Sequence, residues 1–334
     1  MTSNDAAGRP APAARYGFYD RLTAGFPSQI LVDAAEVCNL ACIHCPHPEF
    51  KKSEHYGGRY VDPDLNAKMV DEVRRHGRGC TQYIRYASNG EPLAHPHIYD
   101  MIDDAAQHSG VPVTLTTNGT FMTAKRAERL LAAGVAVVDV SIDAYTPETY
   151  AAIRLNGDLA VTRSNVLGLL QLAKQAPAKT KVVVSYVEMP QNAHETGAFE
   201  KFWKDQGVDY VVVRRLHSCS GAKIPLAEVR RKENEQVARR PCLYPWERIV
   251  LNARGDLSFC PSDWVHGSYV ADYRSVTIYD TWHGEFYRKL REAHLANDFS
   301  QHGFCGQCPD WRSTRWPDEG RSYASMMEEF MVEE

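Results

Sequence analysis

The segment Cys38-Asn39-Leu40-Ala41-Cys42-Ile43-His44-Cys45 carries three cysteines spaced C-x3-C-x2-C, and it follows the apolar run Ile30-Leu31-Val32, which predicts a buried strand. A structural zinc ion or an ordinary iron–sulfur cluster takes four protein ligands. Three thiols on one loop therefore leave one metal position for a ligand that is not one of these cysteines. A zinc site completed by His44 or His47 is the alternative that the spacing leaves open.

Composition excludes several classes of partner. The chain has 334 residues, of which 24% are charged, and a formal net charge of -4. It contains no long basic block, so neither a nucleic acid nor an anionic membrane is indicated as a partner. No apolar run is long enough to cross a bilayer, and residues 1–14 lack the apolar core of a signal peptide. We therefore expect a cytoplasmic protein.

The nine cysteines indicate metal binding or catalysis, because the cytosol keeps thiols reduced and disfavours disulfides. Seven of them fall into two groups, which are Cys38, Cys42 and Cys45, and Cys242, Cys260, Cys305 and Cys308. Two are left over. Cys80 is expected at a helix-to-strand turn and is interpreted as a structural thiol, whereas Cys219 follows the last expected strand of the first part.

Between the two cysteine groups the hydrophobic pattern alternates between short strands and helices. Strands are expected at 30–34, 83–87, 113–117, 137–142, 182–187 and 210–213, and helices at 63–75, 97–107, 123–133, 159–174 and 195–206. This alternation predicts a parallel sheet with right-handed crossovers, built either as a partial barrel or as a doubly wound open sheet. In both architectures the reactive groups lie at the carboxyl ends of the strands.

The cysteine triplet behind the first strand resembles the cluster loop of the radical S-adenosylmethionine (SAM) enzymes. The resemblance implies an α/β fold with a partial (β/α)6 barrel, in which Cys38, Cys42 and Cys45 hold a [4Fe–4S] cluster whose open iron chelates SAM. It also implies that an electron passed to SAM yields the 5′-deoxyadenosyl radical, which abstracts hydrogen from an unactivated C–H bond. The implied partner is an external one-electron reductant such as flavodoxin or ferredoxin.

Several strand ends resemble the SAM-binding elements of that family. Asn89-Gly90-Glu91-Pro92 is similar to the GGEP motif, whose backbone and acidic residue hold the SAM amino group. Asn89 replaces the first glycine, and asparagine tolerates the left-handed backbone that glycine adopts. The further candidates for SAM contacts are Thr117-Asn118-Gly119, Ser141-Ile142-Asp143, Ser185 and Glu188. For each of them a turn former or a buried hydrogen-bonding group is the open alternative.

The second cysteine group accompanies a hairpin expected at 249–251 and 257–259 and a helical stripe over 277–296. With Gly255 and the Trp282-His283-Gly284-Glu285 stretch, Cys242, Cys260, Cys305 and Cys308 resemble the short Twitch form of the SPASM extension. That resemblance implies an auxiliary [4Fe–4S] cluster fully ligated by protein, with a role in electron transfer or support. The expected units are an entry tail at 1–27, the barrel at 28–216, a linker at 217–240, the Twitch domain at 241–315 and a tail at 316–334.

Only 37 residues precede Cys38, and no winged-helix pattern fits in them, so a small polar substrate is expected in place of a peptide. The chain is similar to the epimerases and dehydrogenases that act on carbohydrates and aminocyclitols in aminoglycoside and oligosaccharide antibiotic biosynthesis. Candidate substrate contacts near the strand ends are Tyr86, Tyr186, Arg214, Arg215 and His217. Each is also open to interpretation as an ordinary barrel-mouth residue.

The fate of the substrate radical separates two activities. An epimerase returns a hydrogen atom to the opposite face, and Cys219 is the candidate donor because its S–H bond is weaker than a carbinol C–H bond. A dehydrogenase instead passes an electron to the auxiliary cluster and a proton to a base, which gives a ketone. Other sugar or nucleoside chemistry, such as dehydration or decarboxylation, and peptide modification are further alternatives. A non-enzymatic scaffold stabilised by zinc would explain the thiols and leave the 89–92 turn unexplained.

Overall fold

The computed structural model describes residues 25–87, 89–176 and 179–314. Of the two expected tails, residues 1–24 and 316–334 lie outside these ranges. The described part contains one nine-stranded sheet with the strand order β6-β5-β4-β3-β2-β1-β7-β8-β9. Its strands are β1 (Gln29–Val32), β2 (Tyr83–Tyr86), β3 (Val113–Thr117), β4 (Val137–Ser141), β5 (Lys181–Glu188), β6 (Tyr210–Arg215), β7 (Arg248–Leu251), β8 (Asp256–Ser258) and β9 (Tyr269–Asp272).

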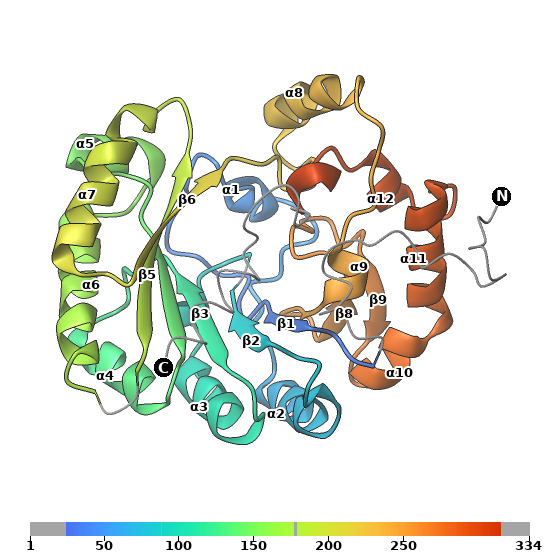
Figure 1. Cartoon of the computed structure of the whole chain (residues 1–334), viewed down its shortest axis with the longest axis horizontal. Coiled ribbons are helices and arrows are strands. Elements are labelled where there is room, and N and C mark those ends of the chain that lie inside the picture. The colour runs from blue at the N-terminus through green and yellow to red at the C-terminus, as the bar shows by residue number, and fades with distance from the viewer. Residues whose placement is uncertain (1–24, 88, 177–178, 315–334) are drawn as a thin grey trace, which may run out of the picture.

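Strands β1 to β6 are all parallel, as the alternation predicted. Helices follow the strands and cover one face of the sheet, which curves around an interior (Figure 1). These helices are α2 (Pro63–Glu72), α3 (Ile98–His108), α4 (Ala124–Ala132), α5 (Pro147–Ile153), α6 (Leu159–Ala173) and α7 (Thr196–Gln206). A doubly wound sheet would carry helices on both faces, so the partial barrel is confirmed and the open-sheet alternative is wrong.

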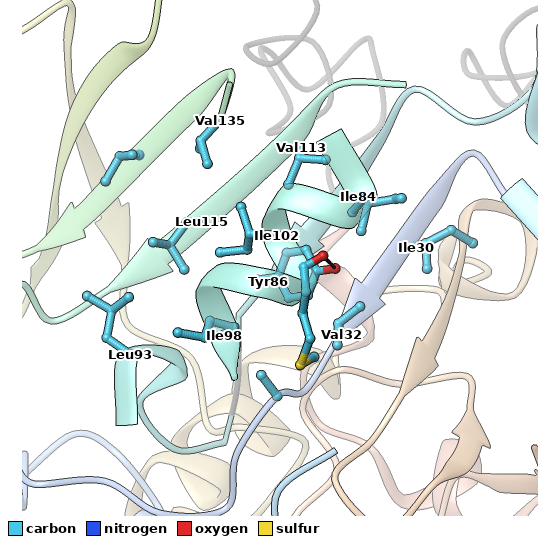
Figure 2. Close-up of a cluster of buried hydrophobic side chains, with 14 of the residues drawn as sticks. Ile30, Val32, Ile84, Tyr86, Leu93, Ile98, Ile102, Val113, Leu115 and Val135 are labelled. Atoms are coloured by element: carbon cyan, nitrogen blue, oxygen red, sulfur yellow. Dashed lines mark hydrogen bonds between the residues drawn. The ribbon is translucent and has the colours of Figure 1, made fainter. Parts of the chain in front are cut away.

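Side chains alternate between the helix face and the barrel interior, as the pleat of a strand requires. Figure 2 shows the helix face, where Ile84 and Tyr86 of β2 meet Ile98 and Ile102 of α3 in the main core. The interior has its own small apolar layer, which is made of Tyr83, Val137, Val183 and Val212. This layer closes one end of the barrel and leaves the carboxyl ends of the strands for other groups.

The C-terminal part continues the barrel sheet. Strand β7 pairs with β1 in parallel, with Gln29 opposite Arg248 and Val32 opposite Leu251. Strands β8 and β9 extend the sheet by antiparallel pairing, which confirms the expected hairpin and adds a strand that was not expected. The expected linker contains α8 (Ile224–Asn234), and the remaining helices are α1 (His47–Phe50), α9 (Tyr244–Glu247), α10 (Ile278–His283), α11 (Glu285–Ala296) and α12 (Gly303–Gln307).

The single helix expected over 277–296 is wrong, because the structure has two helices that meet at Gly284. Gly284 has φ -69° and ψ 168°, an extended conformation that ends α10 and starts α11. A hydrophobic stripe continues across the break through Trp282 and Leu290, which explains why periodicity alone did not reveal it. None of the helices in the described ranges is both long and apolar enough to span a membrane.

Candidate active site

The first cysteine group lies on the loop between β1 and α1, at the carboxyl end of the barrel strands. Cys38, Cys42 and Cys45 all line a cavity of about 920 Å³. Backbone hydrogen bonds fix the loop against the segment after α5, since Ala41 N donates to Leu155 O at 3.0 Å and Ile43 N to Ile153 O at 2.9 Å. The three thiols therefore face one common space.

The turn after β2 supports this loop by close packing. A Cβ added to Gly90 would lie 2.3 Å from Val37 O. The φ of Gly90 is outside the left-handed region, so glycine is required here because the Val37 backbone is close and not because of the backbone conformation. The next residue, Glu91, is 2% exposed, and its backbone N–H donates to Val37 O at 2.8 Å. Backbone packing thus joins the 89–92 turn directly to the start of the cysteine loop.

The Glu91 carboxylate joins the turn after β2 to the end of β3. It accepts hydrogen bonds from Thr117 Oγ1 at 2.6 Å, Asn118 N at 2.8 Å and Leu93 N at 3.0 Å. Burial raises the pKa of Glu91, and these three donors oppose that shift. The Asn118 amide then donates to Asn39 Oδ1 at 3.0 Å and approaches Cys38 Sγ at 4.0 Å. Glu91 therefore positions Asn118 beside a cysteine of the triplet.

A buried ion pair supports the opposite side of the loop. Arg154 donates to Asp143 Oδ2 through Nε at 2.9 Å and NH2 at 2.6 Å, and His44 Nε2 lies 3.5 Å from the same oxygen. The other Asp143 oxygen accepts the Val187 N–H at 2.7 Å. The pKa of Asp143 is lowered because Arg154 and His44 outweigh the opposing effect of burial, which is the largest single influence. Asp143 is therefore ionised, and both of its carboxylate oxygens have hydrogen-bond partners within the protein.

The interior of the barrel above its apolar layer is polar. Asp139 accepts hydrogen bonds from Ser185 Oγ and, at 2.6 Å, from Arg214 NH2. Arg85 NH2 lies 4.0 Å from the same carboxylate and donates to Thr116 Oγ1 at 2.8 Å. Arg85 and Asp139 were missed by sequence reasoning because each is a single polar residue inside an apolar strand. Their positions two residues after Tyr83 and Val137 are the signal that would have placed them in the interior.

Cys219 follows β6 on a loop with an unusual backbone. Cys219 and Ser220 have φ of 54° and 58°, a conformation that non-glycine residues adopt rarely. Asp310 holds the loop in place, since it accepts from Ser218 Oγ at 2.6 Å and from Ser220 N at 2.8 Å. Cys219 lines the same cavity as the triplet. Burial raises the pKa of Cys45, and the Cys42 and Cys219 thiols raise it further.

The second cysteine group surrounds a small cavity of about 60 Å³. All four thiols line it, from the 242 turn, the end of β8 and the α12 segment, and they are Cys242, Cys260, Cys305 and Cys308. Burial raises the pKa of Cys242, and the Cys308 and Cys305 thiols raise it further. Cys260 also lines the larger cavity. The two sites therefore share a wall.

Comparison with known protein families decides between the two interpretations of the cysteine triplet, which are a zinc site and the cluster loop of a radical SAM enzyme. The model described as the radical SAM superfamily matches residues 34–202, half of the chain. The chain belongs to the radical SAM superfamily. A second model, SPASM, described as an iron–sulfur cluster-binding domain, matches residues 242–309. The protein is thus a radical SAM domain followed by a SPASM domain, and the zinc-scaffold alternative is wrong.

Curated radical SAM relatives of the chain include enzymes with different names. A probable GTP 3′,8-cyclase of Methanococcus maripaludis is 25% identical over 221 residues, covering 64% of this chain and 70% of that protein. The mycofactocin maturase MftC of Mycobacterium ulcerans is 27% identical over 220 residues, covering 66% of this chain and only 53% of the relative. MftC of Mycobacterium tuberculosis is 24% identical over 321 residues, covering 83% and 74%.

Solved structures share the fold of this radical SAM protein. BtrN in complex with AdoMet and 2-DOIA has a TM-score of 0.59 and 16% identity, covering 85% of this chain and 93% of that one. Streptococcus suis SuiB bound to precursor peptide SuiA has a TM-score of 0.63 and 14% identity, covering 91% and 73%. These identities are too low to infer a substrate for this protein, so the similarity concerns the fold alone.

A radical SAM domain uses a [4Fe–4S] cluster and SAM, and a SPASM domain uses auxiliary iron–sulfur centres, and the donor sets fit these groups. The triplet offers three thiols and leaves one position to SAM, whereas the second group offers four. Among residues 25–87, 89–176 and 179–314, no three His, Cys, Asp or Glu side chains converge closely enough to hold a single metal ion. We infer that Cys38, Cys42 and Cys45 hold the SAM-binding cluster and that the other four hold the auxiliary one.

The other residues predicted from the sequence divide by the strand face on which they lie. Those that line the large cavity are Asn89, Gly90, Glu91, Asn118, Ser141, Arg214, Arg215 and His217, and their roles stay predictions. Tyr86 and Tyr186 are corrected to core residues. Tyr86 OH donates to Asn66 Oδ1 at 2.6 Å and Tyr186 OH to Asn192 O at 2.5 Å, both on the helix face.

Three predicted SAM contacts are not among the residues that line the large cavity, and their roles stay predictions. Asp143 accepts a hydrogen bond from Arg154 next to the cysteine loop, and Ser185 donates a hydrogen bond to Asp139 in the barrel interior. Glu188 is exposed at the end of β5, and its carboxylate accepts a hydrogen bond from Thr196 Oγ1 at 2.9 Å. The sequence placed Asp143 and Glu188 at strand ends and Ser185 within a strand, but the direction of each side chain depends on partners that the local sequence does not specify.

Asp33, at the end of β1, is a cavity residue that sequence reasoning missed. It is 9% exposed, and its Oδ1 accepts the Asn89 N–H at 2.7 Å. Burial raises its pKa from 3.8 to about 8, partly offset by the Asn89 hydrogen bond and reinforced by Glu36 and Asp263. Asp33 is therefore mostly protonated near neutral pH, and its carboxyl group faces the cavity as a hydrogen-bond donor.

Replacing Asp33 with asparagine is expected to remove a pH dependence of stability. A carboxyl whose pKa is raised by folding stabilises the native state below about 3.8, and this contribution is lost as the pH rises towards about 8. The unfolding free energy of the wild type should therefore fall relative to Asp33→Asn by up to about 1.4 kcal/mol per pH unit in this window. Urea unfolding at pH 5 and pH 8 measures it, with the exposed Asp205→Asn as control; equal pH profiles would contradict the burial of Asp33.

Proposed function

We propose that this radical SAM enzyme abstracts a carbinol hydrogen from a small polyhydroxylated substrate and inverts that carbon with Cys219 as hydrogen-atom donor. The observation that carries the proposal is the place of Cys219, outside both cysteine groups and in the wall of the cavity that the triplet lines. When bound, the cluster and SAM supply the abstraction of the hydrogen atom. The chain has to position the substrate and supply the second hydrogen.

The cavity suits a compact, hydroxyl-rich ligand. Its volume of about 920 Å³ is at the upper end of small-molecule sites, which leaves room for a cofactor and a substrate. Its floor presents Arg85 and Arg214 held in fixed directions by Asp139. Guanidinium groups donate to hydroxyl and anionic oxygens and repel ammonium groups, so the floor favours a neutral or acidic carbohydrate over a polyamine-bearing aminocyclitol at this position.

The S–H bond of Cys219 breaks, a C–H bond forms at the substrate carbon, and a sulfur-centred radical remains on the chain. One electron from the external reductant and one proton from water restore the thiol. Burial and, to a smaller extent, the Asp310 carboxylate raise the pKa of Cys219 to about 12, so the side chain carries its S–H hydrogen at neutral pH.

The test is turnover in D2O. The thiol proton exchanges with water, so anaerobic reaction with a panel of neutral and acidic sugars and aminocyclitols should place one deuterium at an inverted carbon. A ketone without solvent deuterium would overturn epimerisation and support the dehydrogenase alternative. Modification of a peptide in place of any sugar would support the peptide alternative.

A further inference from the structure

We propose that Arg239 and His294 donate N–H hydrogen bonds to the auxiliary iron–sulfur centre and thereby raise its reduction potential. Both side chains line the small cavity that the four cysteines of the second group enclose. Each carries a buried nitrogen, Arg239 Nε and His294 Nε2, that has no hydrogen-bond partner among the described residues. This inference goes beyond the proposed substrate reaction and does not depend on it.

Arg239 is held so that its position is fixed and one donor stays unused. Its terminal nitrogens donate to the carbonyls of Cys305 and, at 3.0 Å, Gly306. The guanidinium lies over the Phe299 ring, with 4.1 Å between its central carbon and the ring centroid. These contacts bind Arg239 to the C-x2-C segment itself. Because buried donors in native proteins nearly always find an acceptor, the remaining Nε–H points to a group that fills the cavity.

His294 is positioned by α11. Its Nδ1 accepts the backbone N–H of Cys242 at 3.3 Å, so Nδ1 carries a lone pair and the proton of the neutral ring is on Nε2. The ring packs edge-on against Phe299 at 4.9 Å and Trp246 at 6.0 Å between centroids. Its rotation is therefore restricted, and the Nε2–H is a second donor without an acceptor from the protein.

Cluster sulfides and cysteine thiolates are the acceptors that suit these donors. Hydrogen bonds to the sulfurs and the charges around a cluster are among the factors that set its potential. Reduction adds negative charge, so an N–H dipole or a guanidinium beside the cluster stabilises the reduced state more than the oxidised one. The pair therefore makes the auxiliary centre a better electron acceptor than four buried thiolates alone would give.

The test uses protein in which Cys38, Cys42 and Cys45 are alanine, so that the auxiliary centre is the only cluster. We expect Arg239→Gln and His294→Phe each to lower the reduced-to-oxidised ratio at a fixed potential about tenfold, equal to about 59 mV for a one-electron couple. An EPR-monitored redox titration measures this shift. Arg291→Gln is the matched control, since Arg291 donates to Pro245 O at 2.9 Å and Trp282 O at 3.2 Å and does not line the cavity.

Two results would overturn the inference. One is a full complement of iron and sulfide in both variants with a midpoint no further from the parent than that of Arg291→Gln. The other is read without changing either side chain, by pulsed EPR of the reduced centre in protein labelled with 15N-arginine and 15N-histidine. We expect weak nitrogen couplings and proton couplings that disappear in D2O, and their absence would show that neither N–H reaches the cluster even if the variants fail to fold.

Discussion

Replacing Cys38, Cys42 and Cys45 together with alanine is expected to abolish reductive cleavage of SAM completely. The three thiols line one cavity and lie within the matched radical SAM region. Without them no cluster is held where SAM binds, so formation of 5′-deoxyadenosine under reducing conditions should fall to the background of a protein-free control. About four irons per chain should persist, because four thiolates ligate a separate cluster.

Two features make this experiment decisive. The substituted loop is also fixed by backbone bonds from Ala41 and Ile43, so the fold should survive the loss of three sulfurs. Cys80→Ala is the matched control, since Cys80 is a free thiol outside both groups and should leave SAM cleavage and the iron content unchanged. Continued SAM cleavage by the triple variant would show that the cluster assignment is wrong.

Replacing Cys219 with alanine is expected to change the product and not merely the rate. Abstraction of the substrate hydrogen does not use Cys219, so 5′-deoxyadenosine should still form. The substrate radical then has no hydrogen donor, would lose one electron to the auxiliary cluster and one proton to a base, and would be isolated as a ketone. Cys260, which lines both cavities, places the auxiliary site next to the space where this radical forms.

The measurement compares products in D2O by mass spectrometry and NMR. Wild type should give the inverted carbon with one deuterium, and Cys219→Ala should give neither inversion nor deuterium at that carbon. Cys80→Ala again tests whether the loss of any free thiol has this effect. An unchanged deuterated product from Cys219→Ala would assign the hydrogen donor to another group and remove the basis of the epimerase proposal.

The parallel core could be predicted from the sequence because its signal is local. Runs such as Val137–Ser141 and Lys181–Glu188 are short and rich in β-branched apolar residues, and each precedes a segment whose apolar residues recur with helical periodicity. The cysteine loop was identifiable for the same reason, since all of its ligands lie within eight residues. In contrast, the pairing of β7 with β1 joins segments more than 200 residues apart, and no local pattern specifies it.

Side-chain direction was the other part that the sequence did not reveal. Tyr86 and Arg85 are neighbours at the end of one strand, yet the phenol packs under α2 and α3 while the guanidinium faces the cavity. Because successive residues of a strand face opposite sides of the sheet, Tyr86 lies on the same side as Ile84, and Arg85 lies on the other. The sequence did not show which of these two sides the helices cover. Gly90 is a related case. A side chain does not fit at this position because the backbone of Val37, on the loop after β1, lies too close, and the sequence around Gly90 does not show this contact.

The central place of β1 has a consequence for how the chain is made. The strand leaves the ribosome early, but one of its edges stays open until β7 is synthesised, as the contact between Ser28 Oγ and Glu247 O across 219 residues shows. At typical elongation rates this interval is roughly ten to forty seconds. During this interval the apolar strand β1 lacks its β7 partner, and an unpaired apolar edge is a site where another chain can pair.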